Sequence, residues 1–142
     1  MKVMQSKQEI ETLLSMAGVE PNRRLGQHFL IDQNLMSILV DSSHLTCTDT
    51  VLEVGPGTGS FTEELAKGAG FVVSVEFDDV LAEIAESRLK SFDNVRVINA
   101  DILENKSTLC GDAVDLIAEK QRELGGRFLL TANLPYNVST PV

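Results

Sequence analysis

The sequence lacks the features that would place it in a membrane, in a disulfide-rich class or around a metal. No apolar run in its 142 residues reaches the roughly 18 residues of a membrane helix, and its first residues lack a signal peptide's apolar stretch. The cysteines Cys47 and Cys110 are far apart, and neither His28 nor His44 has a partner at metal-ligand spacing. We therefore expect reduced, buried thiols, no membrane association, no bound metal and a cytoplasmic protein.

Basic residues are also scarce. The chain carries 12 Lys and Arg against 21 Asp and Glu, which gives a net charge of −9. Between Asp32 and Glu119 there are seventeen acidic residues and only five basic ones. This balance argues against a surface that grips nucleic acid over its whole area. Arg23 and Arg24 are a local exception, because they stand together just before Gly26.

Two helical patterns precede the rest of the chain. Residues 6–9 read Ser-Lys-Gln-Glu, which is a capping box, and apolar residues then follow at helical spacing as far as Gly18. Residues 21–30 have no regular pattern. Asp32 is placed to cap a second, short helix with Leu35, Ile38 and Leu39 on one face.

From residue 51 onward, short apolar runs alternate with helical patterns. We predict strands over 51–54, 71–76, 95–98 and 127–131, and helices over 61–67, 78–90 and 112–124. Strands of near-continuous apolar residues between helices indicate parallel βαβ units. The predicted fold is therefore α/β and Rossmann-like, a parallel sheet with helices on both faces. Residues 139–141 read as another helix start, so we expect the domain to continue.

A glycine loop joins the first predicted strand to the next helix, with the sequence Glu53-Val54-Gly55-Pro56-Gly57-Thr58-Gly59. Glycines are needed where backbone turns tightly and passes close to a ligand. The G-x-G-x-G spacing is one residue shorter than that of dinucleotide folds. The carboxylate of Glu53 would repel a pyrophosphate but suits the cationic sulfonium and amino group of S-adenosylmethionine.

Two more acids follow neighbouring strands. Glu76 ends the second strand, where its carboxylate could accept hydrogen bonds from both ribose hydroxyls of a nucleoside. Asp101 follows the third strand, where it could accept a hydrogen bond from an adenine amine. Each acid alone is more often a solvated side chain or a helix cap. Acids at three successive strand ends together predict a nucleoside site.

The fourth strand ends at Asn133-Leu134-Pro135-Tyr136, which could also be a simple turn. Its functional interpretation has a mechanism, because the exocyclic amine of adenine is a poor nucleophile. The Asn133 side-chain oxygen and the Leu134 carbonyl can accept its two hydrogens, and Pro135 fixes the backbone so that these acceptors converge. Tyr136 offers a face on which the base can stack.

Several segments together resemble the ribosomal RNA adenine dimethyltransferases, a family of class I S-adenosylmethionine-dependent methyltransferases. The match runs from about Arg23 to Val142. The most specific parts are Gly-Gln-His-Phe-Leu at 26–30 and the run at 133–141, and the other matching segments are 53–59, 75–76 and 99–101.

The resemblance implies a cofactor and a substrate. S-adenosyl-L-methionine would be the methyl donor, and two adjacent adenosines near the 3′ end of small-subunit ribosomal RNA the target. Residues 1–31 would be an N-terminal helix with a segment contacting cofactor and RNA. Residues 32–142 would be the S-adenosylmethionine-binding domain, and later strands and a small helical domain would follow in a monomeric full-length protein.

The resemblance also assigns residues to roles. His28 and Leu30 would line the cofactor site with Gln27 nearby. The methionine part of the cofactor would pass close to Gly55. Asn133 would face both the cofactor and the target base. The cofactor-binding set is Gln27, His28, Leu30, Glu53, Gly55, Gly57, Gly59, Glu76, Asp101 and Asn133. The catalytic set is Asn133, Leu134, Pro135 and Tyr136, and the RNA-binding set is Arg23, Arg24 and Tyr136.

Three other functions stay open at this point. The large-subunit adenine methyltransferases of the macrolide-resistance type share the glycine loop and a similar Asn-x-Pro-Tyr motif. An RNA-binding ribosome-assembly factor without turnover is a second alternative, which an intact Asn133 and Tyr136 disfavour. An NAD-dependent oxidoreductase is disfavoured by the short glycine spacing.

Overall fold

A parallel sheet of four strands forms the centre of the structure, which is a computed structural model that describes residue 12 and residues 33–132. The strand order is β3-β2-β1-β6, and all three pairings are parallel. A separate antiparallel ribbon, β4 with β5, follows β3 in the chain. The strands are β1 (Thr50–Val54), β2 (Phe71–Glu76), β3 (Val95–Asn99), β4 (Leu103–Asn105), β5 (Thr108–Leu109) and β6 (Phe128–Ala132).

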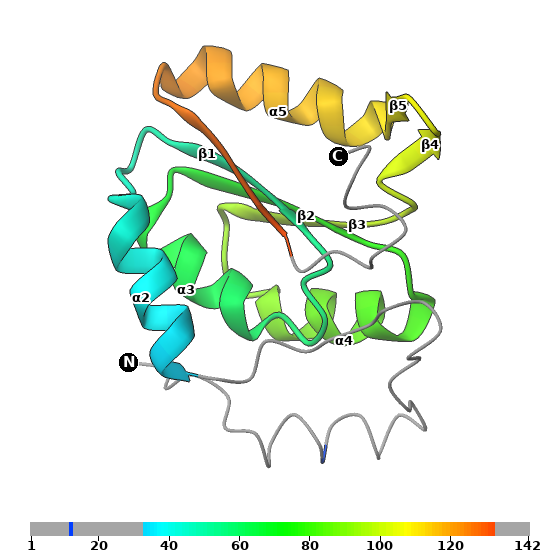
Figure 1. The fold of residues 1–142 in the computed structure, drawn as a ribbon, viewed down its shortest axis with the longest axis horizontal. Coiled ribbons are helices and arrows are strands. Elements are labelled where there is room, and N and C mark those ends of the chain that lie inside the picture. The colour runs from blue at the N-terminus through cyan, green and yellow to red at the C-terminus, as the bar shows by residue number, and fades with distance from the viewer. Residues whose placement is uncertain (1–11, 13–32, 133–142) are drawn as a thin grey trace.

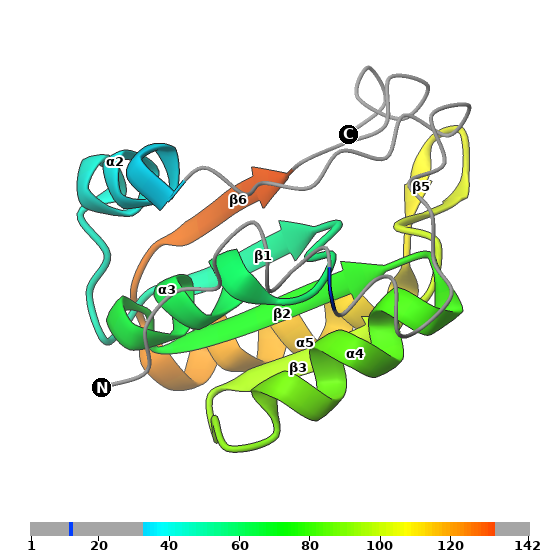
Figure 2. The same ribbon diagram turned by 90° about the horizontal axis from the view of Figure 1, so that it is seen from below.

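Helices cover both faces of the sheet, as predicted (Figure 1). Helix α5 lies on one face, and α3 and α4 lie on the opposite face with α2 beside α3 (Figures 1 and 2). The α/β prediction is therefore confirmed, and the predicted elements between residues 51 and 131 differ from the observed ones by a residue or two at their ends. The helices are α2 (Gln33–Ser43), α3 (Ser60–Gly68), α4 (Asp79–Leu89) and α5 (Gly111–Leu124).

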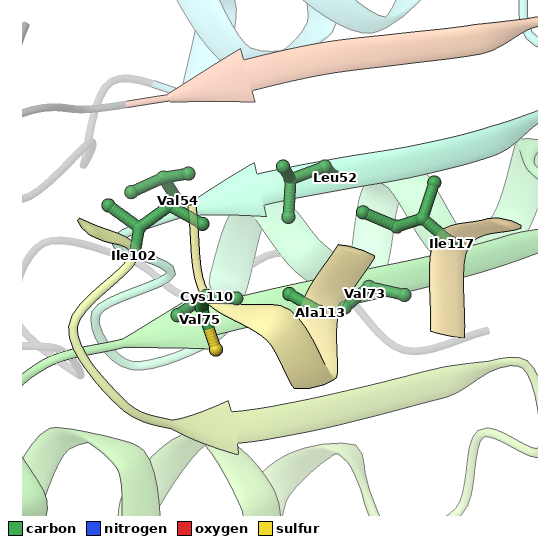
Figure 3. Close-up of a cluster of buried hydrophobic side chains, with 8 residues drawn as sticks. All are labelled: Leu52, Val54, Val73, Val75, Ile102, Cys110, Ala113 and Ile117. Carbon is green, nitrogen blue, oxygen red and sulfur yellow. The ribbon is translucent and has the colours of Figure 1, made fainter. Parts of the chain in front are cut away.

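The two central strands have both faces buried, which explains their near-continuous apolar sequence. Successive side chains of a strand point to opposite faces, so each strand contributes to two cores. One core joins alternate residues of β1 and β2 to α5 and is drawn in Figure 3; its members are Leu52, Val54, Val73, Val75, Ile102, Cys110, Ala113 and Ile117. The other core, on the α3 side, comprises Met36, Val51, Phe61, Leu65, Ala66, Ala69 and Val72.

The structure corrects two expectations and adds one element that was not expected. Ile38 and Leu39 of α2 are exposed, and Met36, four residues before the half-buried Val40, is the residue that packs against the sheet. Of the two free cysteines, Cys110 is buried as expected but Cys47 is exposed. The β4–β5 ribbon was not predicted, because its strands are too short to show alternation. The predicted helix over 6–17 and the irregular segment 21–30 lie outside the described residues, apart from the helical residue 12.

The helices of the described part of the chain include none long and apolar enough to span a membrane. The same residues contain no cluster of three or more His, Cys, Asp or Glu side chains that could hold a metal ion.

A buried carboxylate fastens the beginning of the sheet. Asp49, directly before β1, accepts hydrogen bonds from the backbone N–H of Thr46 at 2.8 Å and from Nη2 of Arg127 at 2.7 Å. The Arg127 guanidinium also donates to the carbonyl oxygens of Ser43 and His44. The end of α2, the start of β1 and the start of β6 are therefore held at one point.

Replacing Asp49 with Asn should destabilise the fold, because a hydrogen bond to a charged group contributes about 1.5–3 kcal/mol. The hydrogen bonds from Arg127 lower the pKa of Asp49 from 3.8 to about 2. A lowered folded-state pKa contributes stability at higher pH that is lost as the pH falls through about 2. As the pH falls below 3.8, urea unfolding should therefore show a smaller loss of folding stability in Asp49→Asn than in the wild type.

The exposed Asp41 of α2 provides a matched control, since Asp41→Asn removes a carboxylate in the same region without touching Arg127. Equal stability of Asp49→Asn and Asp41→Asn at neutral pH would show that the Asp49 contacts contribute nothing.

Candidate functional site

The carboxyl ends of β1, β2 and β3 meet at one edge of the sheet, and the glycine loop after β1 lies there. Gly55, Gly57 and Gly59 all have positive φ angles, of 74°, 59° and 86°. Residues with a Cβ rarely adopt this left-handed conformation, which explains the three glycines. The N–H of Gly55 donates to the carbonyl of Val75 at 2.9 Å, so the loop is tied to β2 at its first residue.

Gly59 also lies close to α4, so that a side chain there would require Leu89 to shift. A Cβ built on Gly59 would lie 3.1 Å from Cδ1 of Leu89 and 3.5 Å from Cα of Ala85. The carbonyl of Gly59 accepts the backbone N–H of Glu63 at 3.1 Å, which begins α3. The loop therefore leaves β1, turns over α4 and enters α3 with little room for bulk at its last glycine.

Glu76, the last residue of β2, connects the glycine loop to the start of α4. Its Oε1 accepts the N–H of Gly57 at 3.0 Å, and its Oε2 accepts the N–H of Asp78 at 3.1 Å. Only 6% of the residue is exposed, and burial raises the pKa of its carboxyl group against the lowering effect of these hydrogen bonds. A carboxylate has about four acceptor positions. The backbone contacts do not use all of them, so Glu76 can still accept a hydrogen bond from a ligand's hydroxyl group.

Glu53 is more deeply buried, below the loop, with 3% of the residue exposed. Its Oε2 accepts hydrogen bonds from Oγ1 of Thr62 at 2.5 Å and from Oγ of Ser74 at 2.8 Å. Burial raises the pKa of Glu53 to about 7, and the negative charge of Glu76 acts in the same direction. Glu53 thus joins β1, β2 and α3 from inside the sheet–helix layer.

Asp101 has a different environment, because it is exposed on the segment that follows β3. Its Oδ1 accepts the backbone N–H of Leu103 at 2.9 Å, and the N–H of Ala100 donates to the Glu76 carbonyl at 3.0 Å. The segment carrying Asp101 is therefore fixed beside Glu76. The structure brings Gly57 and Glu76 into contact and places Asp101 on the adjacent segment.

Phe77 was missed by the sequence reasoning. It directly follows Glu76 and is 60% exposed, and Val80 on the first turn of α4 is also exposed. An exposed aromatic ring beside a buried carboxylate provides an apolar surface for a flat ligand. The sequence feature that could have identified Phe77 is a large aromatic residue at the first position after a strand that ends at the binding edge.

Other predicted site residues lie outside the described residues, so their roles stay predictions. These are Arg23, Arg24, Gln27, His28, Leu30, Asn133, Leu134, Pro135 and Tyr136.

Comparison with solved structures identifies the fold as a Rossmann-like methyltransferase fold. A dimethyladenosine transferase from Plasmodium falciparum matches with a TM-score of 0.62 at 23% identity, over 80% of this chain and 36% of that chain. The 23S ribosomal RNA methyltransferase ErmE matches with a TM-score of 0.53 at 27% identity, over 74% of this chain and 48% of that chain.

Sequence comparison then gives the family. The family model for ribosomal RNA adenine dimethylase matches residues 18–142, and the chain belongs to this family. It is 40% identical over 130 residues to ribosomal RNA small subunit methyltransferase A of Staphylococcus epidermidis, covering 92% of this chain and 42% of that protein. It is 35% identical over 139 residues to a Methanopyrus kandleri protein described as a probable enzyme of the same name, covering 98% and 44%. The chain thus spans less than half the length of these relatives.

The burial of Glu53 predicts an unusual dependence of stability on pH. Because its folded-state pKa is raised from 4.5 to about 7, its contribution is fully present below 4.5 and is lost as the pH rises through about 7. Gln at this position cannot ionise, so Glu53→Gln should gain roughly 3 kcal/mol of stability relative to the wild type as the pH rises to about 8. Urea unfolding at about pH 5 and about pH 8 measures the difference.

Glu86→Gln is the control, since Glu86 is exposed on α4. A difference between Glu53→Gln and the wild type that stays constant across this pH range would contradict a titrating, buried Glu53.

Proposed function

We propose that the protein transfers methyl groups from S-adenosylmethionine to the exocyclic amine of adenines in small-subunit ribosomal RNA. Family membership supports the reaction class, and the names of the curated relatives support the small-subunit substrate. The observation that carries the proposal is the bond between Gly57 and Glu76, because it places a carboxylate with spare acceptor positions against a loop without side chains.

The residues at the binding edge fit this cofactor. Glu76 would accept hydrogen bonds from the ribose hydroxyls, and the left-handed glycines would let the methionine part pass close to the backbone. Phe77 would offer its exposed ring to the adenine, whose amine would donate to Asp101. Glu53 and Glu76 supply negative potential where the sulfonium and amino group carry positive charge.

The cofactor supplies a methyl group on a sulfonium, which is already a good leaving group. The chain would contribute positioning, which is worth more here than a strong general base. Asn133 and the Leu134 carbonyl would hold the target amine with its lone pair directed at the methyl group, and Pro135 would fix these acceptors. Tyr136 would stack on the base, a contact worth about 1–3 kcal/mol. His28, Leu30 and Gln27 would complete the cofactor site, and Arg23 and Arg24 would contact RNA.

A second candidate is methylation of adenine in large-subunit ribosomal RNA. The 27% identity to ErmE over 74% of this chain favours it. The curated relatives of 35–41% identity are small-subunit enzymes by name, and they favour the first candidate. Methylation assays on separate small-subunit and large-subunit particles that lack the modification would distinguish the two.

Replacing Asn133 with Ala in the full-length protein should abolish methyl transfer, because the amine loses the side-chain acceptor that orients its lone pair. Cofactor binding should be largely retained. Incorporation of labelled methyl groups into unmodified small subunits measures transfer, and calorimetric titration with S-adenosylhomocysteine measures binding. Normal turnover by Asn133→Ala would exclude the proposed mechanism.

Replacing Glu76 with Ala should weaken binding of S-adenosylhomocysteine about ten- to hundredfold, because a lost hydrogen bond to a charged group costs about 1.5–3 kcal/mol. Glu83→Ala is the matched control, since Glu83 is an exposed acid on α4. Circular dichroism would establish that each variant is folded. An unchanged dissociation constant in folded Glu76→Ala would remove Glu76 from the site.

A further inference from the structure

An ion pair between a fully buried carboxylate and a partly buried guanidinium joins the two helices next to the glycine loop. Glu63, in the first turn of α3, is fully buried, and Arg88 is in the last turn of α4. Nη2 of Arg88 donates to Oε2 of Glu63 at 3.2 Å, and Nε lies 3.0 Å from Oε1. The guanidinium therefore donates one hydrogen bond to Oε2 and lies in ion-pair contact with Oε1.

Stability alone is a weak reason for such a pair. Removing two charges from water costs several kcal/mol, and apolar side chains of similar size often replace a buried ion pair without loss of stability. The more exposed pair Lys67–Glu64 on the same helix α3 carries a smaller cost, since the Lys67 ammonium remains in water and the Glu64 carboxylate is only partly buried. The placement of the Glu63–Arg88 pair relative to the candidate site is therefore informative.

Two contacts connect the residues of the ion pair to the glycine loop. The backbone N–H of Glu63 donates to the carbonyl of Gly59 at 3.1 Å. Leu89, the residue after Arg88, lies against Gly59, where a Cβ would be 3.1 Å from its Cδ1. Gly59, Glu63, Arg88 and Leu89 thus form a closed ring of contacts, so a change in the spacing of α3 and α4 displaces the last glycine of the loop.

The beginning of α4 is attached to the same loop. Asp78 caps α4 by accepting the N–H groups of Val80 and Leu81, each at 3.0 Å, and its own N–H donates to Glu76. Glu76 in turn accepts the N–H of Gly57. Helix α4 is therefore linked to Gly57 indirectly, through its N-cap Asp78 and Glu76, and it lies against Gly59 through Leu89.

We propose that Arg88 is a positioning residue for the cofactor site, which acts through Glu63 and Leu89 on the glycine loop. The ion pair holds the first turn of α3 at the separation from α4 at which Gly57, Gly59 and Glu76 form one binding surface. Arg88 itself does not touch the cofactor. This inference rests on the proposed function, because its consequence is the affinity for S-adenosylmethionine.

The test compares three variants of the full-length protein, Arg88→Lys, Arg88→Met and the double variant Glu63→Met/Arg88→Met. Each is assayed by calorimetric titration with S-adenosylhomocysteine and by urea unfolding. Arg88→Met should lose both stability and affinity, since it leaves the Glu63 carboxylate buried without the guanidinium. The double variant should recover most of the stability, because neither charge of the pair remains, but its affinity should stay at least tenfold below that of the wild type.

Arg88→Lys keeps the charge but not the two-point contact, so it should fold and bind several-fold more weakly. Its KM for S-adenosylmethionine should rise while kcat at saturating cofactor stays unchanged, which a general loss of folded protein would not produce. Lys67→Met is the matched control, because it removes the more exposed ion pair of α3 and should leave the dissociation constant unchanged.

Two results would overturn the inference. Wild-type affinity in a stable double variant would mean that the pair only supports the fold. Wild-type affinity and KM in folded Arg88→Lys would have the same meaning if the double variant does not fold. Absence of binding by the wild-type protein would instead overturn the proposed function together with this inference, so the two failures are distinguishable.

Discussion

The burial of the Glu53 carboxyl group imposes a condition that the neighbouring elements meet. The central strand β1 is covered on both faces, and a polar group there costs several kcal/mol unless it is hydrogen-bonded. Thr62 on α3 and Ser74 on β2 supply the two hydroxyl donors. The position of α3 over β1 and β2 is therefore fixed by polar contacts as well as by apolar packing. Because the glycine loop joins β1 to α3, these contacts also fix the two ends of the loop.

Contacts with β2 and α4 hold the part of the glycine loop that the Glu53 contacts do not reach. The Glu53 contacts fix α3 against the sheet, but they do not reach the far side of the loop. Glu76 at the end of β2 and Leu89 on α4 do so, because both contact glycines of the loop. The loop is thus held between α3 and α4, so its positive φ angles are maintained by contacts on two sides.

Sequence predicted the sheet well and the contacts poorly, for physical reasons. Strands buried on both faces are nearly all apolar, so β1 and β2 could be predicted to within a residue. The buried face of α2 could not, because this helix has apolar residues on several sides and only packing decides which are covered. The ion pairs Asp49–Arg127 and Glu63–Arg88 join residues 78 and 25 positions apart, and only the three-dimensional fold brings them together.

In the candidate site too, the sequence predicted the types of residue but not their surroundings. Glu53, Glu76 and Asp101 were predicted as acids at three successive strand ends. The structure gives them increasing exposure, from the interior at Glu53, through the loop contact at Glu76, to the surface at Asp101. Burial raises the pKa of the first two carboxyl groups, and a cation bound at this edge would favour their charged forms. Their electrostatic response to a ligand therefore follows from depth in the fold, which strand-end position in the sequence does not specify.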